Sequence, residues 1–251
     1  MSRTRRRFLV EESQIREGRV VLTGAQFHHA RRVLRLKRGD EIGVFTRSGV
    51  QYPARVESAH SDSMVLEIIS QRGDVRTAGL QLTVVQGVVK GPAMDMIVQK
   101  CGELGVARLV AAGMKRCAVR LRPEQQEAKR ERWQKIADRA AEQCSAARPM
   151  QVSVARDLAD ALGLCRQIPI IALHQEERES SLGQAIKRAG GAASLALVIG
   201  PEGGLDAEEV EMLGRAGAQF ASLGPRVLKA ETAALAACAI VMYTLGELGE
   251  L

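Results

Sequence analysis

From Leu80 onward, the chain alternates short apolar runs with helical patterns, and this alternation limits the possible folds most strongly. Each apolar run is short and is followed by a segment with apolar residues at helical spacing. Such alternation is typical of a mostly parallel sheet that helices cover on both faces, so we expect an α/β fold. The predicted strands are 80–89, 106–112, 168–173, 195–199 and 218–223, and the predicted helices are 93–104, 123–147, 182–188, 207–216 and 231–245.

The first seventy residues have a different pattern, in which β-type runs are separated by turn residues. These runs are 7–11, 19–22, 40–46, 51–58 and 63–70. One helical pattern, 25–36, interrupts them; its apolar side carries Phe27, Ala30, Val33 and Leu34, and its other side His28, Arg31, Arg32 and Arg35. We therefore expect a small β-rich domain over 1–72, a polar linker at 71–79, and a second domain over 73–251.

Positive charge is concentrated at the N-terminal end. Residues 1–38 hold eleven lysines and arginines against three acids, although the net charge of the whole chain is only +7. A basic end on a nearly neutral body favours a polyanionic partner, above all nucleic acid. A solvated, solubilising charge run is the alternative. Aromatic residues make up only 3% of the chain, too few for base-stacking platforms, so charge and shape must supply most of the recognition.

Other patterns argue against a membrane protein and against a metal site. The longest apolar run, 233–242, is about half the length that a membrane-spanning helix needs, and no apolar stretch follows the first charged residues. The five cysteines are widely spaced, with no CxxC pair. We expect a cytoplasmic protein with free thiols and no structural metal.

The stretch VIGPEGGL at 198–205 places a glycine-rich loop directly after a predicted strand. Ligands collect at the carboxyl ends of parallel strands. The loop lacks the lysine and hydroxyl residue of a P-loop and does not have GxGxxG spacing, which argues against a phosphate cradle. Its glycines permit a close backbone approach that suits the polar edge of an adenine. A tight turn that ends in a helix cap at Asp206 is the alternative.

The next predicted strand ends in LGPRVLKAETA at 223–233, again glycine followed by proline. Together the two loops resemble the SPOUT class of RNA methyltransferases, specifically the family that methylates N3 of a uridine in 16S ribosomal RNA. Its signature IGPEGG, followed by LG-x-R-(I/V)-L-(R/K)-x-ETA, is matched almost residue for residue. The resemblance covers essentially the whole chain and extends to 29–40, to 86–105 with Lys90, Asp95, Gln99, Lys100 and Glu103, and to Arg132, Trp133, Glu142 and Gln143.

The chain departs from the family at one place: Ser145 and Ala146 stand where the family usually has glycine and arginine. This position therefore lacks the arginine that the family offers to RNA there, and Arg148 is close enough in sequence to substitute.

The resemblance implies a PUA-like N-terminal domain and a methyltransferase domain whose chain end forms a trefoil knot. It also implies S-adenosylmethionine as cofactor, 16S ribosomal RNA within the assembled small subunit as substrate, and a homodimer. One alternative is an RNA-binding or ribosome-assembly protein that kept the fold and lost the chemistry. A dehydrogenase is disfavoured because no GxGxxG follows the first strand of the second domain.

The resemblance and the chemistry of the side chains together give candidate roles to individual residues. The candidate catalytic residues are Arg226, which would orient the base or stabilise its negative charge, and Glu231, which could accept a proton or only favour the first turn of the last helix. The cofactor-contacting candidates are Leu173, His174, Gly200, Pro201, Glu202, Gly203, Gly204, Leu223, Gly224, Arg226, Val227 and Leu228. A lone histidine such as His174 could equally be structural. The RNA-contacting candidates are Arg31, Arg32, Arg35, Lys90, Arg116 and Arg120, each of which could also be a solvated charge.

Overall fold

The computed structural model describes residues 6–71 and 79–249. These residues form two compact units, one comprising 6–71 with 141–149 and the other 79–140 with 150–249. The predicted domain boundary after residue 72 and most of the predicted linker lie outside the described residues. The sequence did not predict that 141–149 belongs with the N-terminal unit.

The first unit is built on a mixed six-stranded sheet in the order β1-β4-β5-β6-β3-β2. The β1–β4 pair is parallel and the other pairs are antiparallel. Alternation along the strands builds its core: Val20 and Leu22 of β3 are buried while their neighbours are exposed. The strands are β1 Arg7–Leu9, β2 Ile15–Arg16, β3 Arg19–Thr23, β4 Glu41–Phe45, β5 Gln51–Ala59 and β6 Ser63–Ile68, with a short 3-10 turn at Glu12–Gln14.

The helix of this unit is interrupted, unlike the single helix that we predicted over 25–36. An α-helix, α1 (Gly24–His28), continues into a π-helical turn, η2 (His29–Val33). The wider turn, closed by a bond from the Leu34 N–H to the His29 carbonyl, changes the helical spacing that the prediction assumed. Val33, predicted to face the core, is consequently 66% exposed. Arg35 lies beyond the helix with a φ of +52°.

Residues 141–149 pack on the N-terminal sheet. The Glu142 carboxylate accepts a hydrogen bond of 2.9 Å from the backbone N–H of Leu9, and Ala141 packs against Leu9 and Phe45. The family-matched Glu142 thus satisfies a backbone donor of strand β1.

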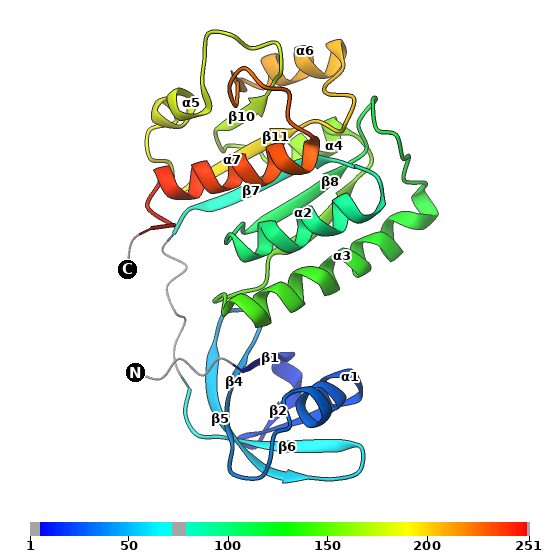
Figure 1. Ribbon diagram of the computed structural model, residues 1–251, viewed down its shortest axis with the longest axis vertical. Helices are drawn as coiled ribbons and strands as arrows, with labels where there is room; N and C mark the ends of the chain where they lie inside the picture. The colour runs from blue at the N-terminus through cyan, green and yellow to red at the C-terminus, as the bar shows by residue number, and fades with distance from the viewer. Residues whose placement is uncertain (1–5, 72–78, 250–251) are drawn as a thin grey trace. The chain divides into compact units, whose positions relative to one another are not determined.

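The second unit has a six-stranded sheet in the order β12-β10-β11-β7-β8-β9, in which every pairing is parallel (Figure 1). This agrees with the predicted α/β class. The short edge strand β9 was missed because its two valines alternate with polar and small residues instead of forming an apolar run. The strands are β7 Gln81–Gly87, β8 Arg108–Ala112, β9 Gln151–Ala155, β10 Ile170–Leu173, β11 Ser194–Ile199 and β12 Gln219–Ala221.

Helices cover both faces of this sheet, because successive side chains of the buried strands point to opposite sides. On β7, Leu82 and Val84 belong to one apolar cluster and Val85 to the other. The first cluster is covered by α2 (Gly91–Glu103), α3 (Pro123–Cys144), α5 (Leu182–Arg188) and α7 (Ala230–Thr244). The second is covered by α4 (Leu158–Gly163), which the sequence did not predict, and α6 (Ala207–Arg215).

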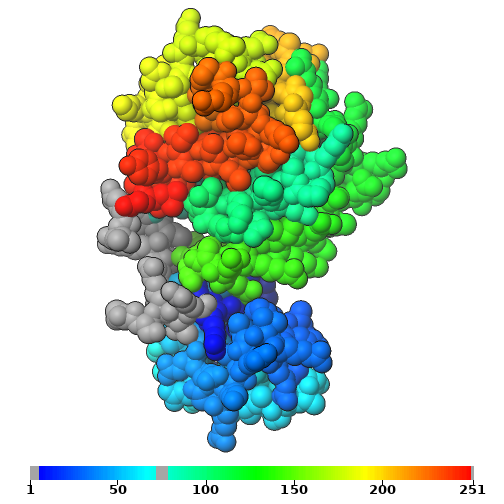
Figure 2. All heavy atoms as spheres, in the orientation of Figure 1, coloured from blue at the N-terminus to red at the C-terminus, as the bar shows by residue number. Residues whose placement is uncertain are grey.

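Helix α7 is strongly apolar, and its residues Ala230, Ala234, Ala237 and Cys238 are buried against neighbouring elements. It packs against α2 and α5, and the space-filling view shows α7 beside α2 on one face of the unit (Figure 2). Within residues 6–71 and 79–249, no helix combines the length and the apolar character needed to span a membrane. None of the five cysteines, all of which lie among the described residues, forms a disulfide bond.

Candidate functional site

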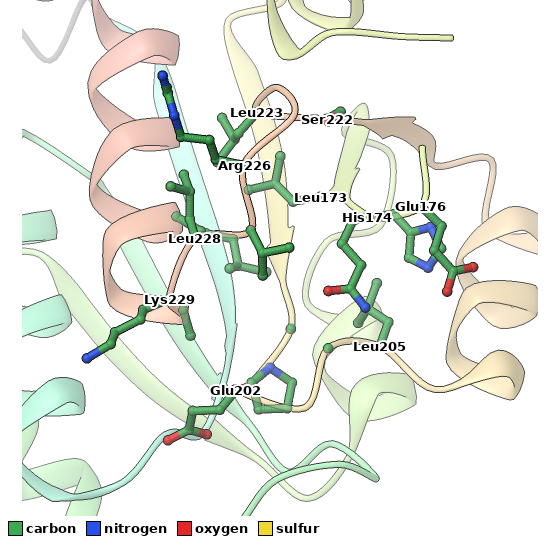
Figure 3. A pocket seen from close by; sticks show the side chains of 18 of the residues that line it. Leu173, His174, Glu176, Glu202, Leu205, Ser222, Leu223, Arg226, Leu228 and Lys229 are labelled. Atoms are coloured by element: carbon green, nitrogen blue, oxygen red, sulfur yellow. The ribbon is translucent and has the colours of Figure 1, made fainter. Parts of the chain in front are cut away.

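Three loops meet at the carboxyl ends of the neighbouring strands β12, β10 and β11. They are the glycine-rich loop after β11, the loop that joins β12 to α7, and the segment 174–178 after β10. Together they line a cavity of about 910 Å³ (Figure 3). Ligands of α/β proteins bind at the carboxyl ends of the parallel strands, where this cavity lies. Its volume is in the range of small-molecule sites.

The cavity brings together nearly all of the predicted cofactor-contacting residues. Gly203 is the exception: a Cβ at that position would lie 2.9 Å from the Arg116 Cβ, so this glycine packs against the β8–α3 connection instead. The predicted residues on the cavity wall are Leu173, His174, Gly200, Pro201, Glu202, Gly204, Leu223, Gly224, Arg226, Val227 and Leu228.

The loop after β11 is a tight turn that leads directly into a capped helix. The Gly204 N–H donates to the Pro201 carbonyl at 2.9 Å, and Gly204 has a φ of +72°, which favours glycine. Asp206 then caps α6: its carboxylate accepts from the Glu208 N–H, and the Glu209 carboxylate accepts from the Asp206 N–H. The helix cap that the sequence offered as an alternative is therefore present, beside the cavity wall.

Neighbouring elements hold this loop through two further contacts. The Glu202 carboxylate accepts a hydrogen bond of 3.0 Å from the Lys90 backbone N–H at the start of α2. On the other side, Arg116 donates to the Gly203 carbonyl at 3.3 Å and lies 3.6 Å from the Asp206 carboxylate. The adjacent Lys115 pairs with Glu208, and this hydrogen bond raises the pKa of Lys115.

The loop between β12 and α7 is exposed at its tip. Gly224 has a φ of +109°, and its N–H donates to the Ser222 hydroxyl at 3.2 Å. Arg226 is exposed, and Val227 is 84% exposed. Figure 3 shows Leu223, Arg226 and Leu228 on this loop, which ends where α7 begins.

Glu231 lies in the first turn of α7, where a carboxylate interacts favourably with the helix dipole. It also lines the cavity. Both roles considered for Glu231 are thus compatible with its position.

His174 occupies a structural position as well as a place on the wall. Its backbone N–H donates to the Ala221 carbonyl at 3.0 Å, which continues the β10–β12 pairing. Its ring meets that of Phe220 edge to face at 5.9 Å.

The cavity wall includes residues that the sequence did not single out. Gln175, Glu176 and Arg178 follow β10, and Lys229 precedes α7. The polar run HQEER, directly after the apolar strand β10, could have indicated these residues. It follows the carboxyl end of a parallel strand, as the other two cavity loops do. Glu177, in the same segment, accepts from the backbone N–H groups of Glu179 and Ser180, which lower its pKa.

The predicted RNA-contacting residues are divided between the two units. Lys90 and Arg116 line the cavity, and Arg120 is exposed on the β8–α3 connection. The others lie in the first unit, where Arg31 donates to the His60 carbonyl at 2.8 Å. Among the described residues, no side-chain partner is found for Arg32, Arg35, Lys90 and Arg120.

Comparisons with known proteins agree with this geometry. The family model of the RNA methyltransferase domain matches residues 76–242, and that of the RNA methyltransferase PUA domain matches 22–69. Ribosomal RNA small subunit methyltransferase E from Synechocystis is 33% identical over 236 residues, covering 93% of this chain and 76% of that protein. The Bacillus subtilis protein of the same name is 29% identical over 227 residues, covering 88% and 89% of the two chains.

The solved structures that match almost the whole chain include two methyltransferases. One is ribosomal RNA small subunit methyltransferase E from Neisseria gonorrhoeae bound to S-adenosyl methionine, with a TM-score of 0.80, 27% identity, and coverage of 95% of this chain and 97% of that one. The other is a Legionella pneumophila methyltransferase in complex with the same cofactor, with a TM-score of 0.84, 27% identity, and coverage of 96% and 98%. From the matched domains, the identity and the coverage, the chain belongs to the ribosomal RNA small subunit methyltransferase E family of RNA methyltransferases.

Proposed function

We propose that this protein transfers a methyl group from S-adenosylmethionine to N3 of a specific uridine in 16S ribosomal RNA. The observation that carries the proposal is the meeting of the IGPEGG loop and the LGPRVLKAETA loop at one cavity. Each loop is matched to the family by sequence, and the parallel sheet brings them together on either side of the end of β10, which lies between β11 and β12.

The cavity suits an adenosyl cofactor. Leu173, Leu223 and Leu228 provide apolar wall, and the tight turn at Gly200–Gly204 presents backbone amide and carbonyl groups that suit the polar edge of an adenine. We assign Leu173, Leu223, Leu228 and the cavity-lining residues of this turn, with His174, Gly224 and Val227, to cofactor binding. S-adenosylmethionine supplies an electrophilic methyl group on a sulfonium when it is bound.

The protein's own residues must then orient the base and favour its anionic form. Arg226 is exposed on the loop at the cavity, where a guanidinium could orient the uracil or stabilise negative charge on its oxygen atoms. Glu231, at the start of α7, is our candidate proton acceptor. Exclusion of water favours methyl transfer, because the anionic uracil meets the cationic sulfonium in that step. Positioning and desolvation therefore supply most of the rate acceleration.

The proposed substrate is RNA within the assembled small subunit, which places the reaction in the cytoplasm. The cations Arg32, Arg35, Lys90 and Arg120, which have no side-chain partner within the described ranges, are suited to phosphate contacts, and we assign RNA binding chiefly to the domain over 1–72. The target base must be accessible to the cavity, as in an RNA loop or after it is drawn out of its stack.

We further propose a knotted second domain and a homodimer. The sheet order β12-β10-β11-β7, with α7 returning to pack on α2, supports a threaded chain end. Three exposed apolar side chains on these two helices, Met96, Ile240 and Tyr243, support an interface between copies. Sedimentation of an Ile240→Glu variant should show monomer where the parent protein shows dimer. A Leu164→Glu variant, at an exposed leucine outside α2 and α7, is the control.

Mass spectrometry of small-subunit RNA from a strain lacking the protein tests the function directly. We expect one uridine to lose a methyl group and to regain it after incubation of the particles with the protein and S-adenosylmethionine. Methylated RNA in the deletion strain would contradict the proposal. Titration with S-adenosylmethionine separates the enzyme from the alternative of a non-catalytic RNA-binding protein, which would show no binding.

A further inference from the structure

We infer that Gln86, at the end of strand β7, is a positioning residue that holds the IGPEGG loop in its ligand-binding shape. Gln86 is fully buried and is not part of the cavity wall. The inference rests on the proposed function for its consequence, because the loop that Gln86 holds is the one assigned to S-adenosylmethionine.

The Gln86 amide bridges the ends of two neighbouring strands. In the β7–β11 pair Gln86 lies opposite Ile199, the last residue before the loop. Its Nε2 donates to the Gly87 carbonyl at 2.9 Å and to the Gly200 carbonyl at 3.3 Å. The side chain therefore fixes the first peptide group of the loop to the end of β7.

Backbone packing at the same point leaves little freedom. A Cβ on Gly87 would lie 2.6 Å from both the nitrogen and the Cδ of Pro201, so the two chains are already in close contact. Gly200 is similarly constrained, since a Cβ there would lie 3.0 Å from the Gly204 carbonyl carbon. Displacement of the Gly200 carbonyl would thus move the whole turn.

Stability alone does not account for a glutamine here. Its Oε1 is buried and has no hydrogen-bond partner among the described residues. An unsatisfied buried acceptor is costly, and an apolar residue of similar shape would avoid that cost. What the amide supplies in return is a donor directed at the Gly200 carbonyl.

Two substitutions and a matched control test this role. Gln86→Met keeps the length of the side chain and removes the donor. Gln86→Glu replaces the amide by a carboxyl group. When ionised, this group has no donor and faces two carbonyl oxygens; when protonated, it donates one hydrogen bond. Thr83→Val, another buried polar site on β7, is the control for general disturbance of the strand.

The readouts are the melting temperature without ligand, the dissociation constant for S-adenosylmethionine, and hydrogen exchange of the loop amides at 200–205 in the free protein. For Gln86→Met we expect an unchanged or higher melting temperature, faster exchange in the loop, and about tenfold weaker cofactor binding, which is the loss of one hydrogen bond. For Gln86→Glu we expect cofactor affinity to recover as pH falls, because the protonated carboxyl donates again.

Two results would overturn the inference: loop exchange and cofactor affinity unchanged in Gln86→Met, or equal losses in Gln86→Met and Thr83→Val together with a lower melting temperature in both. Failure of the proposed function is distinct, since it would appear as an absence of cofactor binding in the unsubstituted protein. Hydrogen exchange would still report on the role of Gln86 in that case.

Discussion

The carboxylate of Glu202 accepts a hydrogen bond of 3.0 Å from the backbone N–H of Lys90, although the two residues are 112 positions apart. This contact joins the IGPEGG loop to the start of α2. Glu202 therefore both lines the cavity and satisfies a backbone donor at a helix N-terminus, where a negative charge is also favourable.

Two substitutions of Glu202 should separate the hydrogen bond to Lys90 from the favourable negative charge at the helix N-terminus. Glu202→Ala leaves the Lys90 N–H to solvent and should cost about 1 kcal/mol, or roughly 2–4 °C in melting temperature for a chain of this size. Glu202→Gln keeps an acceptor oxygen and should retain most of the stability. Scanning calorimetry checks the prediction, and equal melting temperatures for the two variants would contradict it.

Arg226→Ala should reduce methylation far more than cofactor binding. Arg226 is exposed on the loop before α7, so its removal should leave packing intact. We expect a loss of about 10²-fold or more in turnover, typical of one lost charge-stabilising donor, with the dissociation constant for S-adenosylmethionine nearly unchanged. Arg166→Ala, an exposed arginine before β10, is the control. Undiminished methylation by Arg226→Ala would refute the role assigned to it.

The cations of the first unit should govern the salt dependence of RNA binding. A double Arg32→Ala, Arg35→Ala variant should bind RNA more weakly and lower the slope of log K against log salt by roughly 1 to 2, because each phosphate contact contributes about one. Cofactor affinity should not change. Arg19→Ala is a suitable comparison, since Arg19 is paired with Glu57. An unaltered slope in the double variant would indicate that these arginines are only solvated.

Asp95 joins α2 to α3 by accepting from Arg132 and, at 3.2 Å, from the buried Trp133 indole N–H. Asp95→Ala leaves that indole donor unpaired, with an expected loss of about 1–3 kcal/mol in unfolding free energy. Asp95→Asn keeps an acceptor and should lose less. Trp133 is the only tryptophan of the chain, so its fluorescence reports the change directly during urea unfolding. A stable Asp95→Ala variant with unchanged emission would contradict this account.

The buried cysteine thiols should make the folded protein less stable at alkaline pH. The Cys101 thiol lies 3.9 Å from that of Cys238, and this contact together with burial raises the pKa of Cys101. Burial also raises the pKa of Cys117 and Cys165. The unfolded chain therefore loses thiol protons first, at about pH 8.5, so the free energy of unfolding should fall as pH rises beyond that value.

Urea unfolding from pH 7.5 to 10 measures this slope, which should be shallower in Cys101→Ala. In the native protein at neutral pH, alkylation should reach the exposed Cys144 first and Cys101 only after unfolding. A slope unaffected by the substitution, or rapid native labelling of Cys101, would argue against the effect.

Local patterns in the sequence were sufficient to predict the strands and helices whose connecting loops line the cavity. The apolar runs before 174, 200 and 222 and the glycines after them are short-range signals, and each strand and loop was predicted close to its observed place. The interrupted helix at His29–Val33 was missed because the apolar spacing of an α-helix does not reveal a π turn.

The sequence by itself determined the α/β class and the two glycine-bearing loops, since both depend on neighbouring residues. Only the tertiary structure decided that the segment after β10 completes the cavity, that Glu202 reaches Lys90, and that Gln86 holds Gly200. The physical reason is the strand order, in which β7 pairs with β11 and β10 lies between β11 and β12. Residues far apart in sequence therefore meet at the carboxyl ends of these strands. Burial of both sheet faces is compatible with several strand orders, and no local pattern selects this one.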